Sequence, residues 1–255
     1  MKPASRREKI VDRVRELGKI SVDDLADNLQ ASRETIRRDL TLLAEEGRIR
    51  KVHGAAVLSE SNAESAFHVR MKEAAAEKRV VGERAADLFD SGDAMFVDTG
   101  TTTLFFAEAL ARKSGMTIIT NSILVAQALA RGKGSNTIFM LGGEYKDDAA
   151  ENVGPLAIEQ ISRFNAHHAV LTVGAITASG IMDFSLDEVG VARAMVERAR
   201  TVTVIADGSK LDKEALFEVC PLSAVSRLVI NRRPEGALAK ALARARVEVI
   251  LAEAP

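Results

Sequence analysis

The chain contains few of the residues from which cross-links and aromatic surfaces are built. Its 255 residues include one cysteine and no tryptophan, and aromatic residues make up only 4% of them. The single cysteine, Cys220, excludes an intrachain disulfide and a zinc site made of several cysteines, and we expect it to be a small buried residue. So low an aromatic content argues against a stacking surface for single-stranded nucleic acid.

Long apolar runs are also absent. The longest stretch without Asp, Glu, Lys or Arg spans 19 residues, 164–182, and it contains two histidines and two glycines. Such a segment is too polar to span a bilayer. The first residues are charged and form no apolar signal core, so we do not expect secretion. Together with the cysteine usage, these features predict a cytoplasmic protein.

The charge of the chain is distributed unevenly along the sequence. The formal net charge is −1. Residues 1–57 contain 13 Lys and Arg against 10 Asp and Glu, whereas the remainder contains 22 against 26. A basic head on an acidic body hints at a nucleic-acid-binding module joined to a second domain.

The first region predicts three short helices followed by a ribbon. Ser21 and Ser32 are typical N-caps for the second and third helices, which only a very short break separates. Ile36, Leu40 and Leu43 would form the buried stripe of the third helix, opposite a cationic face. An apolar run around a turn then predicts a short β-ribbon. These elements predict a winged helix-turn-helix. The alternative is a plain three-helix core with a solvated basic face.

The rest of the chain predicts a linker and an α/β domain. Residues 58–76 are rich in Ser, Ala, Asn and Glu, and we interpret them as a linker between a DNA-binding domain at 1–57 and a second domain at 77–255. Seven apolar runs in the second domain have helical patterns between most of them, which predicts a mainly parallel sheet covered on both faces. The predicted strands are 94–97, 116–119, 137–141, 169–173, 202–206, 227–230 and 247–251.

Polar and glycine-rich segments follow several of these strands. Because ligands of open α/β sheets bind beyond the carboxyl ends of the strands, we predict a pocket there for a small molecule that carries a phosphate. A helix that begins just after Gly100 would offer its N–H groups to the anion. The predicted pocket residues are Asp98, Gly100, Thr101, Thr102, Thr120, Asn121, Gly142, Gly143, Glu144, Gly174, Asp183, Asp207 and Lys210.

The charged members of this set have distinct predicted roles. Lys210 would supply a point charge to the phosphate, and the carboxylates of Asp98, Glu144, Asp183 and Asp207 would accept sugar hydroxyls. The alternative is that Asp183 and Asp207 are turn caps and that Lys210 is a solvated surface residue. No segment matches a Walker loop or a dinucleotide fingerprint, and we predict no cofactor.

We also predict no metal site. The adjacent His167 and His168 should point in different directions on a strand, so they should not share a metal ion.

Two sets of motifs are specific enough to indicate a family. The helix-turn-helix signature consists of Arg6, Ile10, Val14, Ser32, Thr35, Ile36, Arg37, Arg38, Asp39 and Leu40, and His53-Gly54 ends the wing. The second set consists of Asp98-Thr99-Gly100-Thr101-Thr102, Thr120-Asn121, Gly142-Gly143-Glu144, Asp187-Glu188 and Asp207-Gly208-Ser209-Lys210. With these motifs, both halves resemble the DeoR/GlpR family of bacterial transcription regulators. Between the halves, Phe67, Arg70, Glu77 and Lys78 are similar to the interdomain segment of that family.

The resemblance implies a winged helix-turn-helix plus a sensor domain of the sugar-phosphate isomerase and CoA-transferase type. It also implies a repressor of carbohydrate or polyol genes that binds DNA as a dimer or tetramer and is released by a phosphorylated sugar or polyol. Residues 142–144, 161–164 and 183–184 are most similar to the glycerol-3-phosphate branch. Ala55 and Ala192 depart from the family, since many relatives carry a glycine and a lysine there.

The physical properties of the third helix agree with DNA binding. Its cationic face fits the major groove, hydroxyls at its start would hold phosphates, and cations of the wing would contact the DNA backbone. One head with a small net charge binds weakly, so two or more copies on repeated half-sites are expected. The predicted DNA-binding residues are Ser32, Arg33, Glu34, Thr35, Arg37, Arg38, Thr41, Arg48, Arg50 and Lys51.

Two other classes of function are open at this stage. A sugar-phosphate isomerase would need a base such as Glu144, Asp183 or Glu188, but nothing in the sequence marks any of them as tuned. We therefore predict no catalytic residue and no enzyme activity. The second alternative is a DNA-binding protein whose sensor domain serves only in oligomerisation, and the polar strand ends argue against it.

Overall fold

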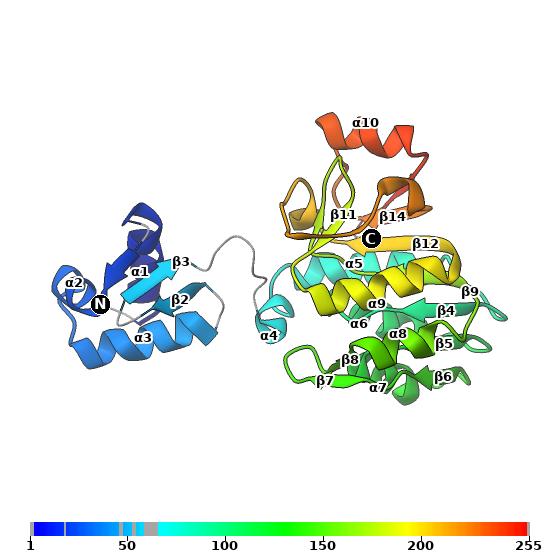
Figure 1. Cartoon of the computed structure of the whole chain (residues 1–255), viewed down its shortest axis with the longest axis horizontal. Coiled ribbons are helices and arrows are strands. Elements are labelled where there is room, and N and C mark those ends of the chain that lie inside the picture. Colours follow the sequence, from blue (N-terminus) through cyan, green and yellow to red (C-terminus); the bar gives the residue numbers. More distant parts are fainter. Residues whose placement is uncertain (1–2, 18, 46–47, 53–54, 59–65, 254–255) are drawn as a thin grey trace. The chain divides into compact units, whose positions relative to one another are not determined.

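The computed structural model describes residues 3–17, 19–45, 48–52, 55–58 and 66–253. The chain divides into two compact units, Met1–Val69 and Arg70–Pro255 (Figure 1). No helix within the described ranges is long and apolar enough to cross a membrane.

The first unit is a winged helix-turn-helix, as predicted. Its strands form an antiparallel sheet in the order β1-β3-β2, in which the three-residue strand β1 was not predicted. Ile10, Leu25, Ile36 and Leu43 are fully buried between the helices. The elements are α1 Pro3–Leu17, β1 Lys19–Ser21, α2 Val22–Leu29, α3 Arg33–Glu45, β2 Ile49–Val52 and β3 Ala55–Leu58.

Local hydrogen bonds set the helix boundaries in this unit. The Oγ of Ser21 accepts a hydrogen bond from the N–H of Asp24 at 3.0 Å, and the Oγ of Ser32 accepts one from the N–H of Thr35 at 3.1 Å. Both predicted N-caps are therefore confirmed. Gln30, with φ of 49°, adopts the left-handed conformation that ends α2.

The second unit contains a seven-stranded parallel sheet in the order β15-β14-β12-β9-β4-β5-β6. All seven predicted strands belong to it, although two of them begin earlier than predicted. The strands are β4 Ala94–Val97, β5 Thr117–Thr120, β6 Thr137–Met140, β9 Ala166–Leu171, β12 Ala199–Ala206, β14 Arg227–Ile230 and β15 Glu248–Leu251.

Helices cover both faces of this sheet and give a three-layer α/β/α arrangement (Figure 1). Phe106 of α6 and Val125 of α7 pack with Met95 against one face, together with α5. Met195 of α9 and Leu238 of α10 pack with Phe96 against the other, together with α8. The helices are α5 Ala75–Ala86, α6 Thr101–Leu110, α7 Ile123–Arg131, α8 Pro155–Ile161, α9 Leu186–Glu197 and α10 Gly236–Arg244.

Two small antiparallel sheets complete the unit and were not predicted. One is the hairpin of β7 Glu144–Lys146 and β8 Glu151–Val153. The other contains β10 Ala175–Ile176, β11 Ile181–Asp183 and β13 Phe217–Cys220. As predicted, Cys220 is buried.

The segment predicted as a linker, 58–76, is partly regular. Strand β3 reaches Leu58, the short helix α4 spans Phe67–Arg70, and α5 begins at Ala75. Residues 59–65 lie outside the described ranges.

Candidate nucleic-acid interface and small-molecule site

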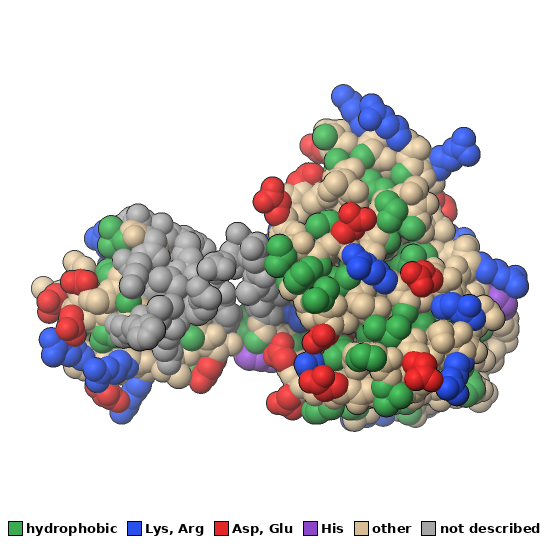
Figure 2. Space-filling view, in the orientation of Figure 1, with side chains coloured by type: hydrophobic (Ala, Val, Ile, Leu, Met, Phe, Trp, Pro, Cys, Tyr) green, Lys and Arg blue, Asp and Glu red, His purple; other side chains and the backbone are tan. Residues whose placement is uncertain are grey.

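The solvent-facing side of α3 is cationic. Arg33, Arg37 and Arg38 are exposed, whereas Ile36 and Leu40 are buried. Figure 2 shows Lys and Arg side chains gathered over the first part of this helix, with acidic side chains beside them. The structure thus presents a charged surface of the kind that the helix-turn-helix prediction requires.

Two of these arginines already form ion pairs. Arg33 Nε lies 2.8 Å from Asp23 Oδ1, and Arg38 Nε lies 3.2 Å from Glu34 Oε1. All four side chains are more than half exposed, so each pair is easily exchanged for a phosphate contact. Arg37 makes no ion pair with any residue that the structure describes, which leaves its guanidinium the most available.

Other predicted DNA-binding residues have structural partners. Thr41 donates a hydrogen bond to the carbonyl of Arg37 at 2.8 Å, and the Oγ atoms of Ser32 and Thr35 lie 2.8 Å apart. Arg48 binds the Glu8 carboxylate through both terminal nitrogens, at 2.8 and 2.7 Å, and so joins the wing to α1.

The other predicted DNA-binding residues of the wing have no described side-chain positions. The side chains of Arg50 and Lys51, and the turn His53-Gly54, lie outside what the structure describes. Within the fold, Arg6 and Asp39 from the family signature form an ion pair between α1 and α3 and are both largely buried. These two residues therefore hold the helices together.

Buried carboxyl groups gather at the carboxyl edge of the parallel sheet. Asp98 follows β4 and is only 4% exposed. Burial raises the pKa of Asp98 well above its usual range, the charges of Glu188 and Asp183 raise it further, and the hydrogen bond from the N–H of Thr99 opposes them. A carboxyl group in these surroundings readily exchanges hydrogen bonds with a hydroxyl ligand.

Glu151, on β8, joins this cluster although the sequence analysis did not select it. Asn121 donates a hydrogen bond from Nδ2 to Glu151 Oε2 at 3.1 Å. Burial raises the pKa of Glu151 to about 8, and the nearby charges of Asp98 and Asp183 add to this effect, while that of Arg70 opposes it. Glu151 thus changes its protonation state close to neutral pH.

Cationic groups lie beside the carboxyl cluster. Lys78 of α5 is only 3% exposed, and its Nζ donates a hydrogen bond to the carbonyl of Arg70. Burial lowers the pKa of Lys78, the charge of Asp207 raises it, and those of Lys210 and Arg70 lower it. Lys78 is therefore close enough to Arg70, Asp207 and Lys210 for their charges to shift its pKa.

The N-terminus of α6 faces the same edge of the sheet. Its N-cap is Gly100, and no side chain in the described part of the chain caps the helix with a hydrogen bond. Thr101 and Thr102 are 5% and 2% exposed. The N–H groups of the first turn are therefore available to an anion, and the binding of a phosphate there stays a prediction.

Gly100 itself has a steric role. Its φ is +146°, and a Cβ there would lie 2.0 Å from Cγ2 of Thr172, so a larger residue would collide with the segment after β9. Its contribution to the predicted pocket stays a prediction.

Several predicted pocket residues shape the strand ends through hydrogen bonds. Asp183 accepts hydrogen bonds from the N–H groups of Gly174 at 2.9 Å and Phe184 at 2.6 Å. Asp207 accepts one from the N–H of Ser209 at 2.9 Å. Thr120 accepts one from the N–H of Ser122 at 3.1 Å. Asp183 and Asp207 are therefore turn caps, as the alternative interpretation held, yet their charges still act on Glu151 and Lys78.

The segment after β6 is arranged differently from the prediction. The N–H of Gly142 donates to the side chain of Gln160 at 3.0 Å, and Gly143 packs so closely on β8 that a Cβ would lie 2.5 Å from the carbonyl oxygen of Val153. Glu144 is exposed and accepts a hydrogen bond from Lys146 Nζ at 2.8 Å. Its assignment to the pocket stays a prediction.

Two buried polar atoms at this edge make no hydrogen bond with any described residue. They are Oδ1 of Asn121 and Oγ1 of Thr99. Buried polar atoms nearly always have a partner, so these atoms are suited to bind a ligand or a water molecule.

Sequence reasoning therefore missed Glu151 and did not place Lys78 in the pocket. Lys78 appeared only as part of the interdomain resemblance, because a lysine in an amphipathic helix is normally solvated. Glu151 lies in a hairpin that the sequence pattern did not predict.

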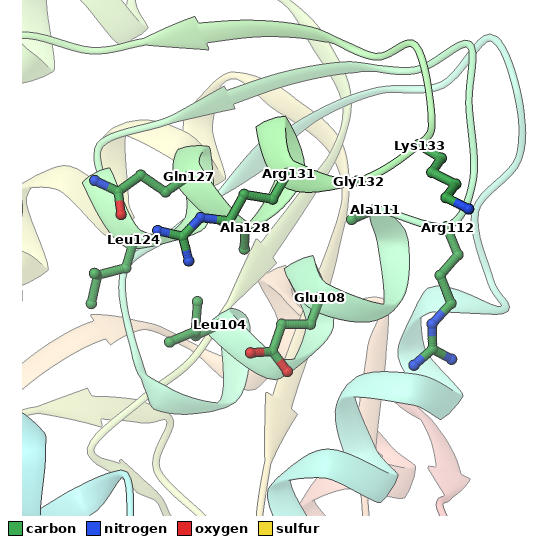
Figure 3. A pocket seen from close by; sticks show the side chains of 10 residues that line it. All are labelled: Leu104, Glu108, Ala111, Arg112, Leu124, Gln127, Ala128, Arg131, Gly132 and Lys133. Atoms are coloured by element: carbon green, nitrogen blue, oxygen red, sulfur yellow. The ribbon is translucent and has the colours of Figure 1, made fainter.

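A surface groove of about 560 Å³ lies elsewhere, between α6 and α7. Figure 3 shows Glu108, Arg112 and Arg131 along it. None of the residues that line this groove belongs to the predicted pocket.

One geometric prediction was wrong. His167 Nδ1 and His168 Nε2 both approach Oδ1 of Asp93, at 3.8 and 3.3 Å. Asp93 lies just ahead of β4, at the amino edge of the sheet, where side chains from both faces can reach it. Strand alternation therefore does not separate the two rings here.

Both halves of the chain match families of known domains. Residues 6–62 match the DeoR-like helix-turn-helix domain, and residues 73–232 match the DeoR C-terminal sensor domain. The chain therefore belongs to the DeoR family.

Relatives match over almost the whole chain. The HTH-type transcriptional repressor CsqR of Escherichia coli (strain K12) is 32% identical over 96% of this chain and 94% of its own length. The glycerol-3-phosphate regulon repressor of Haemophilus influenzae is 35% identical over 92% of each chain. The repressor GlcR of Bacillus subtilis is 31% identical over 96% of this chain and 94% of its own. The protein is thus a DeoR-family transcriptional repressor and not an enzyme.

Solved structures resemble the chain only distantly. A D-ribose-5-phosphate isomerase in complex with phospho-erythronic acid has a TM-score of 0.40 and 15% identity, over 53% of each chain. The eIF2B beta subunit from Chaetomium thermophilum has a TM-score of 0.46 and 14% identity, over 83% of this chain and 58% of its own. Likeness at this level carries no conclusion about activity.

Proposed function

We propose that the protein represses genes of carbohydrate or polyol catabolism and that a phosphorylated sugar or polyol, such as glycerol-3-phosphate, releases it from DNA. One observation carries the proposal. The carboxyl edge of the sheet combines buried carboxyl groups with the buried Lys78, with the half-buried Arg70 and Lys210 near it, and with a helix N-terminus that no described side chain caps. This combination suits a ligand that has hydroxyls at one end and a phosphate at the other.

The residues divide between these two tasks. The N–H groups and hydroxyls of Thr101 and Thr102, together with Lys210, bind the phosphate. Asp98 and Glu151 accept hydroxyl groups, and the partnerless Oδ1 of Asn121 accepts a further one. Asp183 and Asp207 hold the turns around the ligand and tune these groups by their charges.

The DNA-binding half of the proposal rests on α3. Residues 1–57 place α3 in the major groove, and residues 77–255 sense the effector and assemble the homo-oligomer in the cytoplasm, where the DNA lies. A dimer or tetramer supplies the second recognition helix, because one head with 13 Lys and Arg against 10 Asp and Glu neutralises few phosphates.

The relatives support a phosphorylated polyol as the effector, since three of them are named glycerol-3-phosphate regulon repressors. At one departure from the family, Ala192 of α9 is only 5% exposed and packs in the core. Ala192 therefore offers no cation to a ligand. The groups that bind the phosphate are then the N-terminus of α6 and Lys210. The alternative, an isomerase-like enzyme, has no comparable support.

The test starts from operator DNA that the protein itself selects from a random duplex library. We expect glycerol-3-phosphate, or another phosphorylated sugar or polyol of a panel, to raise the Tm of the protein and to weaken its operator binding at fixed salt. The matched control is the same compound without its phosphate, which should do neither. If no member of the panel changes either the Tm or the operator affinity, the proposal is wrong.

A further inference from the structure

The Asp93–His167–His168 cluster lies at the amino edge of the sheet and has no part in the function proposed above. Strands β4 and β9 run side by side there, with Met95 opposite His168 (Figure 1). Asp93 Oδ1 lies 3.3 Å from His168 Nε2 and 3.8 Å from His167 Nδ1. One ligand atom from each of the three residues lies within 4.8 Å of the other two.

These distances fit a small tetrahedral cation. An ion such as Zn²⁺ binds histidine nitrogens and carboxylate oxygens at about 2.0–2.2 Å, which keeps neighbouring ligand atoms roughly 3.3 Å apart. The pair of Asp93 and His168 already has this separation, and the ring of His167 needs only a small rotation.

The hydrogen bonds of His168 point its free lone pair at Asp93. Thr201 donates its hydroxyl proton to the carbonyl of His167 at 3.1 Å, so it accepts the Nδ1–H of His168 at 2.6 Å. Nε2 of the neutral ring then carries a lone pair and faces a carboxylate oxygen. Two acceptors at this distance repel each other unless a cation lies between them. Histidine ligands of metals are normally oriented by such a hydrogen bond at the other ring nitrogen.

The other two residues differ in how far they are prepared as ligands. The N–H of Ala94 donates to the lone pair of His167 Nδ1 at 3.3 Å, so the ring must rotate away from this hydrogen bond before that nitrogen binds an ion. The N–H of Asp90 donates to Oδ2 of Asp93 at 2.9 Å, which leaves Oδ1 directed at the histidines.

We propose that Asp93, His167 and His168 bind one divalent transition-metal ion of the Zn²⁺ class, with a water molecule at the fourth position. The side chains of Asp93 and His167 are 26% and 46% exposed, so the ion enters from solvent and exchanges with it. The bound ion ties the segment ahead of β4 to the start of β9. Thr201 acts as a positioning residue because it orients the ring of His168.

The test uses the full chain after dialysis against a chelator. Co²⁺ is added while its visible absorption is recorded, and Zn²⁺ binding is measured by calorimetry. We expect one ion per chain, a Co²⁺ spectrum typical of tetrahedral coordination, displacement of Co²⁺ by Zn²⁺, and a higher Tm with the ion bound.

Variants locate the site. His167→Gln and Asp93→Asn should each weaken binding roughly tenfold or more, and Thr201→Val should weaken it while leaving one ion per chain. The control is His68→Gln, which changes an exposed histidine on α4 and should bind the ion as the wild type does. Equal Tm values of the metal-free proteins show that the variants fold.

Two results would overturn the proposal. One is the absence of stoichiometric binding of either ion. The other is binding that His167→Gln and Asp93→Asn leave unchanged, which would mean adventitious binding elsewhere on the chain. In both cases His168 carries its proton on Nε2 and simply donates it to Asp93.

Discussion

Glu151 shows how the burial of one side chain makes the stability of the fold depend on pH. A glutamate in the unfolded chain titrates near its ordinary pKa of 4.5, whereas in the folded protein burial raises the pKa to about 8. Between these two values the folded state holds a proton that the unfolded state has released. The free energy of unfolding therefore falls as the pH rises through this window, and below the lower value the penalty is absent.

Replacing Glu151 by Gln should remove this penalty. The amide oxygen of Gln still accepts the Asn121 hydrogen bond, so the expected result is a gain in stability at pH 8, on the order of a few kcal/mol, that vanishes near pH 4.5. Urea unfolding at several pH values measures it. Glu159→Gln, on the exposed surface of α8, is the control and should follow the wild type. Parallel pH profiles for Glu151→Gln and wild type would contradict the assignment of the raised pKa.

At the scale of elements, regular patterns in the sequence were enough to predict the main architecture. The seven strands of the large sheet are apolar runs between helical segments, and their burial on both faces makes them easy to recognise. The N-caps Ser21 and Ser32 act through neighbours three residues away, so they too are visible locally.

The parts that were missed depend on contacts between distant residues. The strands of the β7–β8 hairpin and of the β10-β11-β13 sheet are two to four residues long, too short for a period to appear. Glu151 acquires its raised pKa only because β8 buries it close to Asp98 and Asp183. Local patterns in the same way placed Asp98 at a strand end but could not reveal that Thr172 fills the space beside Gly100.

The recognition helix α3 carries the next prediction. Changing Arg37 and Arg38 to Ala should keep the fold, because both side chains are exposed and neither contributes to the core. Each lost contact should weaken operator binding by about 1–3 kcal/mol, with the clearer loss at Arg37, which has no ion-pair partner among the described residues. Gel-shift titration at fixed salt measures the change.

The control for this experiment is Lys240→Ala, which removes an exposed cation from α10 in the sensor unit. It should leave operator affinity near the wild-type value. Recognition would have to lie outside α3 if the folded double variant bound the operator as tightly as the control.

At the scale of the whole molecule, an effector can change operator affinity only if its binding to one unit alters DNA binding by the other. The proposed effector residues lie in the unit Arg70–Pro255, whereas α3 lies in the unit Met1–Val69. Arg70, at the end of α4, acts electrostatically on both Glu151 and Lys78. The first residue of the second unit, Arg70, therefore interacts electrostatically with two buried groups of the proposed effector site.

Coupling between the sites is a free energy, so it must be reciprocal. A coupling of about 1–3 kcal/mol would lower operator affinity roughly 5- to 150-fold when the effector binds, and saturating operator DNA would lower effector affinity by the same factor. Calorimetry of the effector with and without operator DNA, set against gel shifts with and without effector, measures both sides. If neither ligand changed the affinity for the other, the effector site and the DNA-binding surface would be uncoupled.

The variant Thr101→Ala with Thr102→Val separates the pocket from the DNA-binding surface. Both threonines are buried at the start of α6, and their loss should weaken the phosphate contact while leaving operator affinity without effector near that of wild type. The expected phenotype is a repressor that the effector no longer releases. Thr103→Val is the matched control, because the Thr103 hydroxyl donates to the carbonyl of Gly100 at 3.0 Å, and its removal should retain release. If the double variant responded to effector as fully as this control does, the phosphate would have to bind away from α6.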